Sequence, residues 1–582
     1  MNQIIINEYG NYFKEFKFAI DNRSDQIHSY YICTKCKKIF LSKKSMKVHQ
    51  CKELSACNTN ISYNLSIKYL LIWLSKKNAT YRSLYDIDFN GFLHNINKKY
   101  ILPSENSLRK STIQFANKIS SQIYKKLNGK AVSLLIDGVE RNSHKYQGQI
   151  LYTPNQLYFL GLFPCEEETK INIATIISET AIKLKNNNAK LIAVCTDNFS
   201  SNISALDGGP FSAQQLSNQN FIRFPCCCHT INLAIKDTFE SKHIDIKNNV
   251  IELINYFKHL SKINNQIKNV PQFIEVRWFS IYYCVSFIIQ HKIYLDQHFL
   301  NNYYDIIQNK YGWPYIYSIL KLLNELITKL ESDFSSVADV FPYFQTTINK
   351  LIEIKDKIPE NFECNIANDL IDSLLDRFSS TVHLNVPILA FFLTGNGMKY
   401  ANNKNEQYYL AANTAIETFQ KYAIDSPEID NLLQFFKYFL NFNNHSFLIS
   451  QNSTDESVNF WKKILNNGKF WSNEPEFFLQ HQEFKGIEKK FAKYALEILS
   501  IPCSECAVER AFSHLSDILM NNKRNLNFET LNSLLIIRMN SIFLKQNGKK
   551  SQSFIMNEMN TLSHINYDRN DPQFEDDALV YF

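Results

Sequence analysis

The pattern of hydrophobic and polar positions changes its period along the chain. From about residue 66 to 125 the apolar residues recur at helical spacing, with an interruption at Pro103. Short apolar runs between polar turns then predict strands, with one helical stretch after the third run and another after the fourth. These runs are Ala131–Ile136, Gln149–Tyr152, Leu157–Leu162, Lys190–Cys195 and Phe221–Cys226. Helical spacing then continues to about residue 495, so the pattern predicts one sheet followed by a long helical block.

The size and composition of the chain indicate a folded protein of several domains. Its 582 residues are too many for one compact core, and 45% of them are hydrophobic, enough to fill large cores. The formal net charge of +7 is mild, so a case for nucleic-acid binding must come from local charge. Charged residues interrupt the N-terminal segment, and no run approaches the roughly 20 apolar residues that span a bilayer. Neither secretion nor membrane insertion is expected.

Cysteine and histidine residues near the N-terminus have the spacing of a zinc site. Cys33 and Cys36 form a knuckle, and His49 follows after twelve residues, which places three ligands around one tetrahedral Zn²⁺. For the fourth ligand we favour Cys51 over Cys57. Because the 13 cysteines fall in small clusters, reduced thiols, metal ligands or core packing are favoured over a disulfide framework.

The same segment is rich in lysine. Lys43, Lys44 and Lys47 belong to a run of basic residues without an acidic one, which would present a positive face to phosphates. The predicted function is DNA binding through a zinc finger. The alternative is a degenerate finger or a protein-binding module.

Two aspartates follow predicted strands. Asp137 comes at the end of the first apolar run and Asp197 at the end of the fourth. If these strands are neighbours, the two carboxylates lie close enough to hold Mg²⁺ ions for phosphoryl transfer. The alternative is that each aspartate is a turn residue or a helix cap. The order of three strands, helix, strand, helix, strand favours the first interpretation, because it is the order of a ribonuclease-H-like sheet.

Two further motifs contain residue types that bind metal or nucleic acid. Cys226-x2-His229 offers two metal ligands, although a buried packing and hydrogen-bonding role is the simpler interpretation without a second pair at matching spacing. Arg277 and Trp278 are adjacent, and such a pair can contact phosphate and stack on an unpaired base. Composition alone favours the alternative, a core tryptophan with a solvated arginine.

The C-terminal region contains two predicted helices. Glu509 lies on the first helix, where it either reaches a metal site or forms an exposed surface with Arg510. The second helix has Asn527 as its predicted cap and an apolar stripe, so it is expected to bury itself against the core or a second subunit. That stripe contains Phe528, Leu531, Leu535 and Ile542.

Taken together, these motifs resemble the hAT superfamily of DNA transposases from residue 30 to 542. The C-terminal stretch is similar to the family's dimerisation segment, and three other blocks are similar to a BED-type zinc finger and to two internal family blocks. The C-terminal residues that carry the resemblance are Pro502, Ser504, Ala507, Glu509, Arg510, Phe512, Ser513, Arg524, Asn525, Leu531, Leu534 and Leu535. The other blocks are the finger, Cys226-x2-His229 and Arg277-Trp278.

The resemblance implies an α/β ribonuclease-H-like core interrupted by a large all-α insertion, plus a small N-terminal zinc finger. Asp137, Asp197 and Glu509 would be the catalytic residues and would bind Mg²⁺ or Mn²⁺. Trp278, beside Arg277, would stabilise an extruded base, and Cys226 and His229 would be supporting residues. The implied domains are a finger at 28–58, a helical region at 66–128, core segments at 129–235 and 496–545 around an insertion at 236–495, and a tail at 546–582.

The leading hypothesis is a cut-and-paste DNA transposase that acts in the nucleus. Its partners would be double-stranded DNA, both the terminal inverted repeats and the target, and further copies of the chain bound through the C-terminal segment. The alternative is a domesticated, catalytically silent descendant that binds DNA and dimerises. A stand-alone nuclease ranks last, because it would not account for the finger or the dimerisation segment.

Overall fold

The structure is a computed structural model, and it divides the chain into two compact units. One unit comprises Met1–Ser121 with Ser513–Phe582, and the other comprises Gln122–Phe512. The described residues are 4–6, 12–19, 27–33, 39–40, 70–76, 84, 103–141, 144–154, 156–207, 209–274, 280–333, 335–359, 362, 365–378, 381–401, 406–441, 454–467, 484, 486–521 and 526–546. Among the described helices, none combines the length and apolar character that crossing a bilayer requires.

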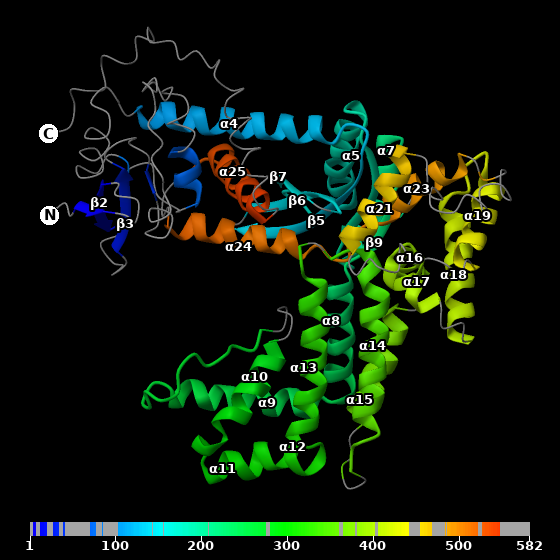
Figure 1. Cartoon of the computed structure of the whole chain (residues 1–582). Helices are drawn as coiled ribbons and strands as arrows, with labels where there is room; N and C mark the ends of the chain where they lie inside the picture. Colours follow the sequence, from blue (N-terminus) through cyan, green and yellow to red (C-terminus); the bar gives the residue numbers. More distant parts are fainter. Residues whose placement is uncertain are drawn as a thin grey trace. The chain divides into compact units, whose positions relative to one another are not determined.

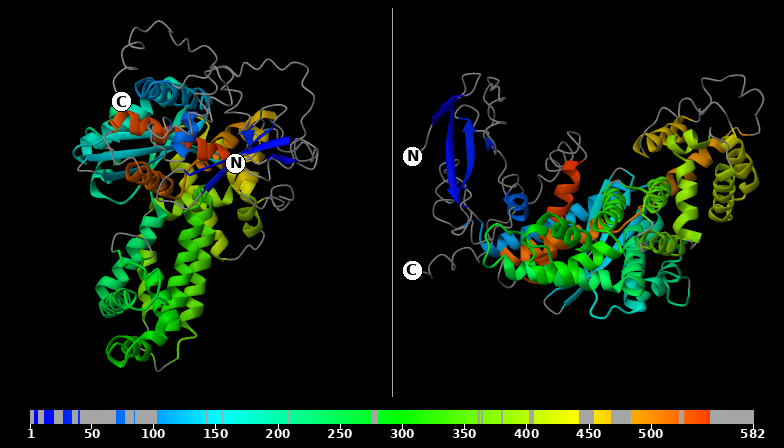
Figure 2. Two further views of the ribbon diagram at one scale, coloured as in Figure 1. Left: turned by 90° about the vertical axis from the view of Figure 1, so that its left-hand side faces the viewer. Right: turned by 90° about the horizontal axis from the view of Figure 1, so that it is seen from below.

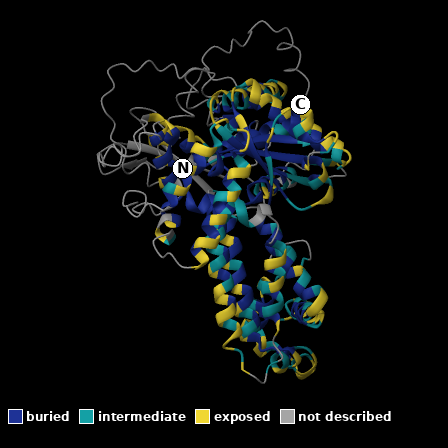
Figure 3. Cartoon of the chain, turned by 90° about the vertical axis from the view of Figure 1, so that its right-hand side faces the viewer, coloured by how far each residue is buried: buried dark blue, intermediate teal, exposed yellow. Residues whose placement is uncertain are grey.

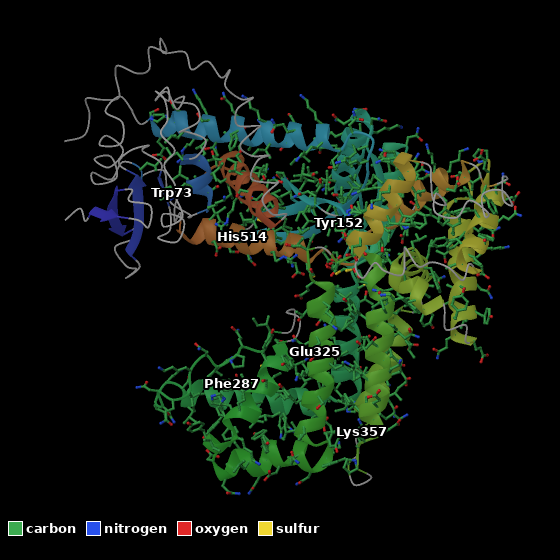
Figure 4. All side chains as sticks on the ribbon, in the orientation of Figure 1. Trp73, Tyr152, Phe287, Glu325, Lys357 and His514 are labelled. Atoms are coloured by element: carbon green, nitrogen blue, oxygen red, sulfur yellow. The ribbon has the colours of Figure 1, made fainter. Side chains whose placement is uncertain are left out.

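A mixed five-stranded sheet lies in the second unit (Figure 1). Its strands are β5 (Ala131–Arg141), β6 (His144–Thr153), β7 (Gln156–Pro164), β8 (Lys190–Thr196) and β9 (Ile222–Pro225). Their order is β7-β6-β5-β8-β9, with β5, β6 and β7 antiparallel and with β8 and β9 running parallel to β5. The strands are mostly buried, as Figure 3 shows, and Tyr152 of β6 is one of the buried side chains that Figure 4 labels. All five predicted strands are confirmed.

The sheet register corrects the predicted position of Asp137. This residue lies inside β5 and not at its end, because the antiparallel pairing with β6 continues to the pair Arg141↔His144. The parallel pairing of β5 with β8 stops earlier, at Leu135↔Cys195. Asp137 and Asp197 therefore each follow the last parallel pair by two residues, on neighbouring strands. The prediction that Asp197 follows its strand directly is confirmed, since β8 ends at Thr196.

Short helices connect the strands of the sheet. They are α5 (Lys170–Asn186), α6 (Ser200–Leu206) and α7 (Ala213–Ser217). Helix α5, which confirms the predicted helix at 171–184, contacts β8 and both of the other helices. Its Thr180 hydroxyl also donates a 2.6 Å hydrogen bond to Gln149 of β6. This helix therefore fixes one side of the sheet.

The predicted helical block is confirmed: the described residues between β9 and α24 are mostly helical. Its first part consists of α8 (Cys227–Asp237), α9 (Ile244–Leu260), α10 (Ser280–His291), α11 (Gln297–Phe299), α12 (Asp305–Lys310), α13 (Trp313–Leu330), α14 (Val337–Lys355) and α15 (Ile366–Phe378), with short π or 3-10 segments at Thr238–Lys242, Lys292–Tyr294 and Leu300–Tyr304. Helices α8, α13, α14 and α15 pack along one another, and α10 packs on α9 and α13 (Figure 2).

The second part of the block leads back to the sheet. It consists of α16 (Thr381–Phe392), α17 (Gly395–Ala401), α18 (Glu406–Tyr422), α19 (Ile429–Asn441), α21 (Thr454–Asn467) and α23 (Ile487–Ile498). Helix α23 contacts β5, and just beyond it the Ser133 hydroxyl of β5 donates a 2.7 Å hydrogen bond to the Ser500 carbonyl. The chain thus returns to the central strand after leaving it more than 300 residues earlier in sequence.

The first turns of helix α24 (Cys506–Asn521) pack against a glycine of strand β6. A Cβ atom on Gly148 of β6 would lie 2.7 Å from both Val508 Cγ1 and Phe512 Cε1. Because such a distance is far inside van der Waals contact, only a residue without a side chain lets α24 approach β6 this closely. Gly148 is the register partner of Asp137, so this close approach brings the start of α24 to the strand that carries Asp137.

The first unit contains a four-stranded antiparallel sheet and two long helices. The strands are β1 (Ile4–Ile6), β2 (Tyr12–Ala19), β3 (Ile27–Cys33) and β4 (Ile39–Phe40), and the helices are α4 (Glu105–Lys126), which extends into the second unit, and α25 (Phe528–Gln546). Cys33 is the last residue of β3. The other predicted zinc ligands, Cys36, His49 and Cys51, lie outside the described residues, as do Lys43, Lys44 and Lys47.

Helix α25 is more deeply buried than its predicted stripe. The Asn527 cap is confirmed, since its side chain accepts a 2.9 Å hydrogen bond from the Thr530 amide. Leu531 and Leu535 are buried as expected, and so are Arg538, which lies on the same face of the helix, and Asn540, which lies on the opposite face. The Arg538 guanidinium contacts Asp517 at 3.2 Å and His514 at 2.8 Å. A pattern of apolar positions does not reveal burial of this kind.

Candidate active site

Three acidic side chains from distant parts of the chain interact electrostatically near the middle of β5 and the end of β8, although their oxygens do not all lie within 4.8 Å of one another. Asp137 comes from β5, Asp197 from the residue after β8, and Glu509 from the first turn of α24. The charge of Asp197 acts on Asp137, and the charge of Asp137 acts on Glu509. Asp137 therefore interacts with both of the other carboxylates. Asp137 and Asp197 are half-buried, whereas Glu509 is exposed to solvent.

Hydrogen bonds fix the two aspartates. The Asp197 Oδ1 atom accepts from the Phe199 amide at 3.0 Å and from Asn202 Nδ2 at 2.7 Å. The Asp137 Oδ1 atom accepts from the Gly138 amide at 2.7 Å. Within the described part of the chain, no hydrogen bond reaches Oδ2 of either aspartate. The second oxygen of each carboxylate thus keeps its lone pairs for another partner.

The carboxylates resist losing their protons. Burial, followed by the charge of Asp197, raises the pKa of Asp137 to about 7, although the Gly138 amide acts in the opposite direction. Partial desolvation, the Cys506 sulfur and the carboxylates of Asp137 and Glu331 raise the pKa of Glu509 to about 8. Since Glu509 also reaches solvent, the upward direction of its shift is the property that matters. The site therefore lacks enough positive charge to balance its carboxylates.

The donor set fits a hard divalent cation. All three side chains offer carboxylate oxygen, which Mg²⁺ and Mn²⁺ prefer. Among the described residues, neither Asp137 nor Asp197 forms an ion pair with a lysine or arginine. A cation placed among them would supply the compensating charge that the raised pKa values show to be missing.

We expect the apparent affinity for Mn²⁺ to rise with pH between about 6 and about 8.5. Protons held by Asp137 and Glu509, with pKa values of about 7 and about 8, must leave before a cation binds. Each displaced proton adds up to about tenfold per pH unit. Calorimetric titration with Mn²⁺ in two buffers of different ionisation heat would measure both the affinity and the proton release. Affinity that stays constant over this range would contradict the assignment.

The affinity for Mn²⁺ should rise with pH, whereas the stability of the metal-free protein should fall with pH. The folded site keeps protons that unfolded carboxyl groups, with ordinary pKa values near 4, have already lost. The contribution of Asp137 and Glu509 to stability is therefore present in full below about pH 4 and is lost as the pH rises through about 7 to 8.

The supporting residues lie beside the acidic site. His229 is half-buried in the first turn of α8, close enough to Asp197 for their charges to interact, and burial lowers the pKa of its imidazole. Cys226 is buried and caps α8, since its sulfur accepts a 3.4 Å hydrogen bond from the His229 amide. Cys226 is thus buried and hydrogen-bonded, which is compatible with the predicted packing role. Arg277 and Trp278 lie outside the described residues.

Several residues at the site were not expected from sequence. Arg510 keeps part of its side chain in solvent, as expected for a surface residue, but it also donates a 3.0 Å hydrogen bond to the Glu331 carbonyl and pairs with Asp333. Glu505, which is almost fully buried, lies close enough to Asp137 for their charges to interact. The available signal was sequence proximity, since Glu505 immediately precedes α24 and Glu509 lies in its first turn.

The fold and site define a mixed α/β chain with interacting acidic residues on β5, after β8 and on α24, and with a long helical block between β9 and α24. Residues 455–541 match the family model described as the hAT family C-terminal dimerisation region, and this match supports membership of the hAT family. The matched region includes α21, α23, α24 and most of α25. No curated protein matches the chain.

Proposed function

We propose that this chain is a cut-and-paste DNA transposase of the hAT type, which cleaves element ends and joins them to target DNA. The observation that carries the proposal is that the carboxylate of Asp137 interacts with those of both Asp197 and Glu509, within a chain whose C-terminal region matches the hAT dimerisation region. Carboxylates that share cations in this way are suited to phosphoryl transfer.

The sheet topology supports a ribonuclease-H-like core. Three antiparallel strands followed by two parallel ones, in the order β7-β6-β5-β8-β9, place the middle of β5 beside the end of β8. The helical block from α9 to α23 separates this sheet from α24 in the sequence. On this proposal the block is an insertion domain, and α24 returns Glu509 to the core.

The residues of the site would have distinct tasks. Bound Mg²⁺ or Mn²⁺ would activate water and balance the charge on the leaving oxygen. Asp197, oriented by Asn202 and the Phe199 amide, would direct its second oxygen into the site. Asp137 and Glu509 would bind as carboxylates after releasing their protons. Water would first cut one DNA strand. A freed 3′-hydroxyl would then attack a phosphorus atom in line and expel the oxygen bonded to the opposite side of that phosphorus.

Binding of DNA would use other parts of the chain. A zinc finger formed by Cys33, Cys36, His49 and Cys51 would present nearby lysines to the phosphates of terminal repeats. Trp278, with Arg277, would stack on an extruded base. The match to the dimerisation region supports assembly of two or more copies. Such a protein would act in the nucleus, where its DNA substrate lies.

Cleavage of element-end DNA by the purified chain tests this function. The substrate is a labelled duplex that carries the inverted repeat flanking the coding region, and the control is a scrambled duplex. We expect nicks at the repeat boundary that require Mg²⁺ or Mn²⁺ and leave a 3′-hydroxyl. Specific binding without any cleavage across divalent cations would instead indicate a domesticated, catalytically silent DNA-binding protein.

A further inference from the structure

Three cysteine sulfurs form a buried cluster beside the acidic site. Cys226 caps α8, Cys228 lies in its first turn, and Cys506 is the first residue of α24. The three Sγ atoms all lie within 4.8 Å of one another. Each side chain is at least 97% buried. Cys227, although equally buried between two members of the cluster, is not part of it.

The geometry is close to that of a thiolate metal site. In tetrahedral zinc sites the Zn–S distance is about 2.3 Å, which places ligand sulfurs about 3.8 Å apart, so a contraction of at most about 1 Å would complete the arrangement. The N-termini of two helices, α8 with 11 residues and α24 with 16, also meet at this cluster. Their dipoles favour negative charge on sulfur.

A buried carboxylate adjoins the sulfurs, and one of its two oxygens lacks a hydrogen-bond partner among the described residues. The side chain of Glu505 is only 1% exposed, and within the described part of the chain its Oε2 atom has no hydrogen-bond partner. Its carboxylate interacts with the Cys226 thiol. Glu505 does not lie within 4.8 Å of all three sulfurs, so it would need a change of rotamer to become a fourth ligand. An uncompensated buried carboxylate is unfavourable unless a cation or a proton neutralises it.

We propose that Cys226, Cys228 and Cys506 bind one zinc-like divalent cation as thiolates, with Glu505 as the fourth ligand. This site is distinct from the oxygen-rich Asp137 site and goes beyond the proposed function. Binding would release the thiol protons to solvent and would involve no oxidation. The cation would tie the start of α24 to the start of α8 across the sequence, and would so hold the helix that carries Glu509.

Metal analysis of the full-length chain tests the proposal. The Cys33→Ser/Cys36→Ser protein serves as background, because the N-terminal finger is itself a proposed zinc site. We expect about one zinc per chain after reconstitution and removal of excess metal. Adding Cys228→Ser or Cys506→Ser should reduce this value to near zero, whereas Cys227→Ser, which changes an equally buried cysteine, should leave it intact.

Cobalt spectroscopy of the background protein avoids reliance on variants that fail to fold. Replacement of zinc by Co²⁺ should give thiolate-to-cobalt charge-transfer bands and the visible bands of a tetrahedral site. The proposal would be overturned by the absence of these bands, or by equal zinc contents in Cys228→Ser and Cys227→Ser. Neither readout depends on DNA cleavage, so failure here would leave the proposed transposase function standing.

Discussion

Replacing Asp197 with asparagine is expected to reduce DNA cleavage by about a thousandfold or more. Loss of one carboxylate from a cation site removes several kcal/mol of transition-state stabilisation, and each 1.4 kcal/mol is about tenfold in rate. The fold should persist, because the amide oxygen of asparagine can accept the same two hydrogen bonds from the Phe199 amide and Asn202. Single-turnover cleavage of element-end DNA measures the effect.

The matched control is Glu140→Gln, which removes a carboxylate from the exposed end of the strand that carries Asp137. It should cleave at the wild-type rate. Binding of element-end DNA, measured by fluorescence anisotropy, should be nearly unchanged in both variants. Cleavage by Asp197→Asn at the wild-type rate would refute the assignment of the site.

Replacing Gly148 with alanine is expected to reduce cleavage by about a hundredfold and to destabilise the second unit. The new Cβ would lie 2.7 Å from Val508 and Phe512, so α24 must move away from β6. Overpacking of this kind typically destabilises by about 1–3 kcal/mol, and a 1 Å displacement of a catalytic group reduces rates about a hundredfold. Denaturant unfolding and single-turnover cleavage measure the two effects.

The control for that variant is Gly209→Ala. Its Cβ would approach only the end of the flexible Lys170 side chain, at 3.3 Å, so stability and cleavage should change little. If Gly148→Ala behaved like Gly209→Ala in both measurements, the close approach of α24 to β6 would not be what positions Glu509.

The sheet could be predicted from sequence because its strands are short apolar runs bounded by polar turns. The end of β5 could not be predicted, since the apolar run stops before Asp137 and the residues beyond it are held in the strand by pairing with β6 and not with β8. Alternation along one strand does not reveal how far its partner continues. The proximity of Asp137 to Asp197 likewise depended on β5 and β8 being neighbours, which topology decides.

The surroundings of Glu509 were the least predictable part of the site. Cys506 and Cys228 are separated by the whole helical block, so no local spacing links their sulfurs. Arg510 was open to interpretation as a surface residue, because its partners, Glu331 and Asp333, lie just after α13. Contacts between residues so distant in sequence arise from the return of the chain to β5 through α23.

Iron-mediated cleavage of the protein backbone tests most directly whether the three carboxylates form one cation site. Fe²⁺ substitutes for Mg²⁺ in oxygen-rich sites, and with ascorbate and peroxide it generates radicals that cut the chain near the bound ion. We predict cuts near Asp137, Asp197 and Glu509 together, suppressed by excess Mg²⁺ and absent from Asp197→Asn. Cuts near only one of these residues, or cuts that Mg²⁺ does not suppress, would contradict the account.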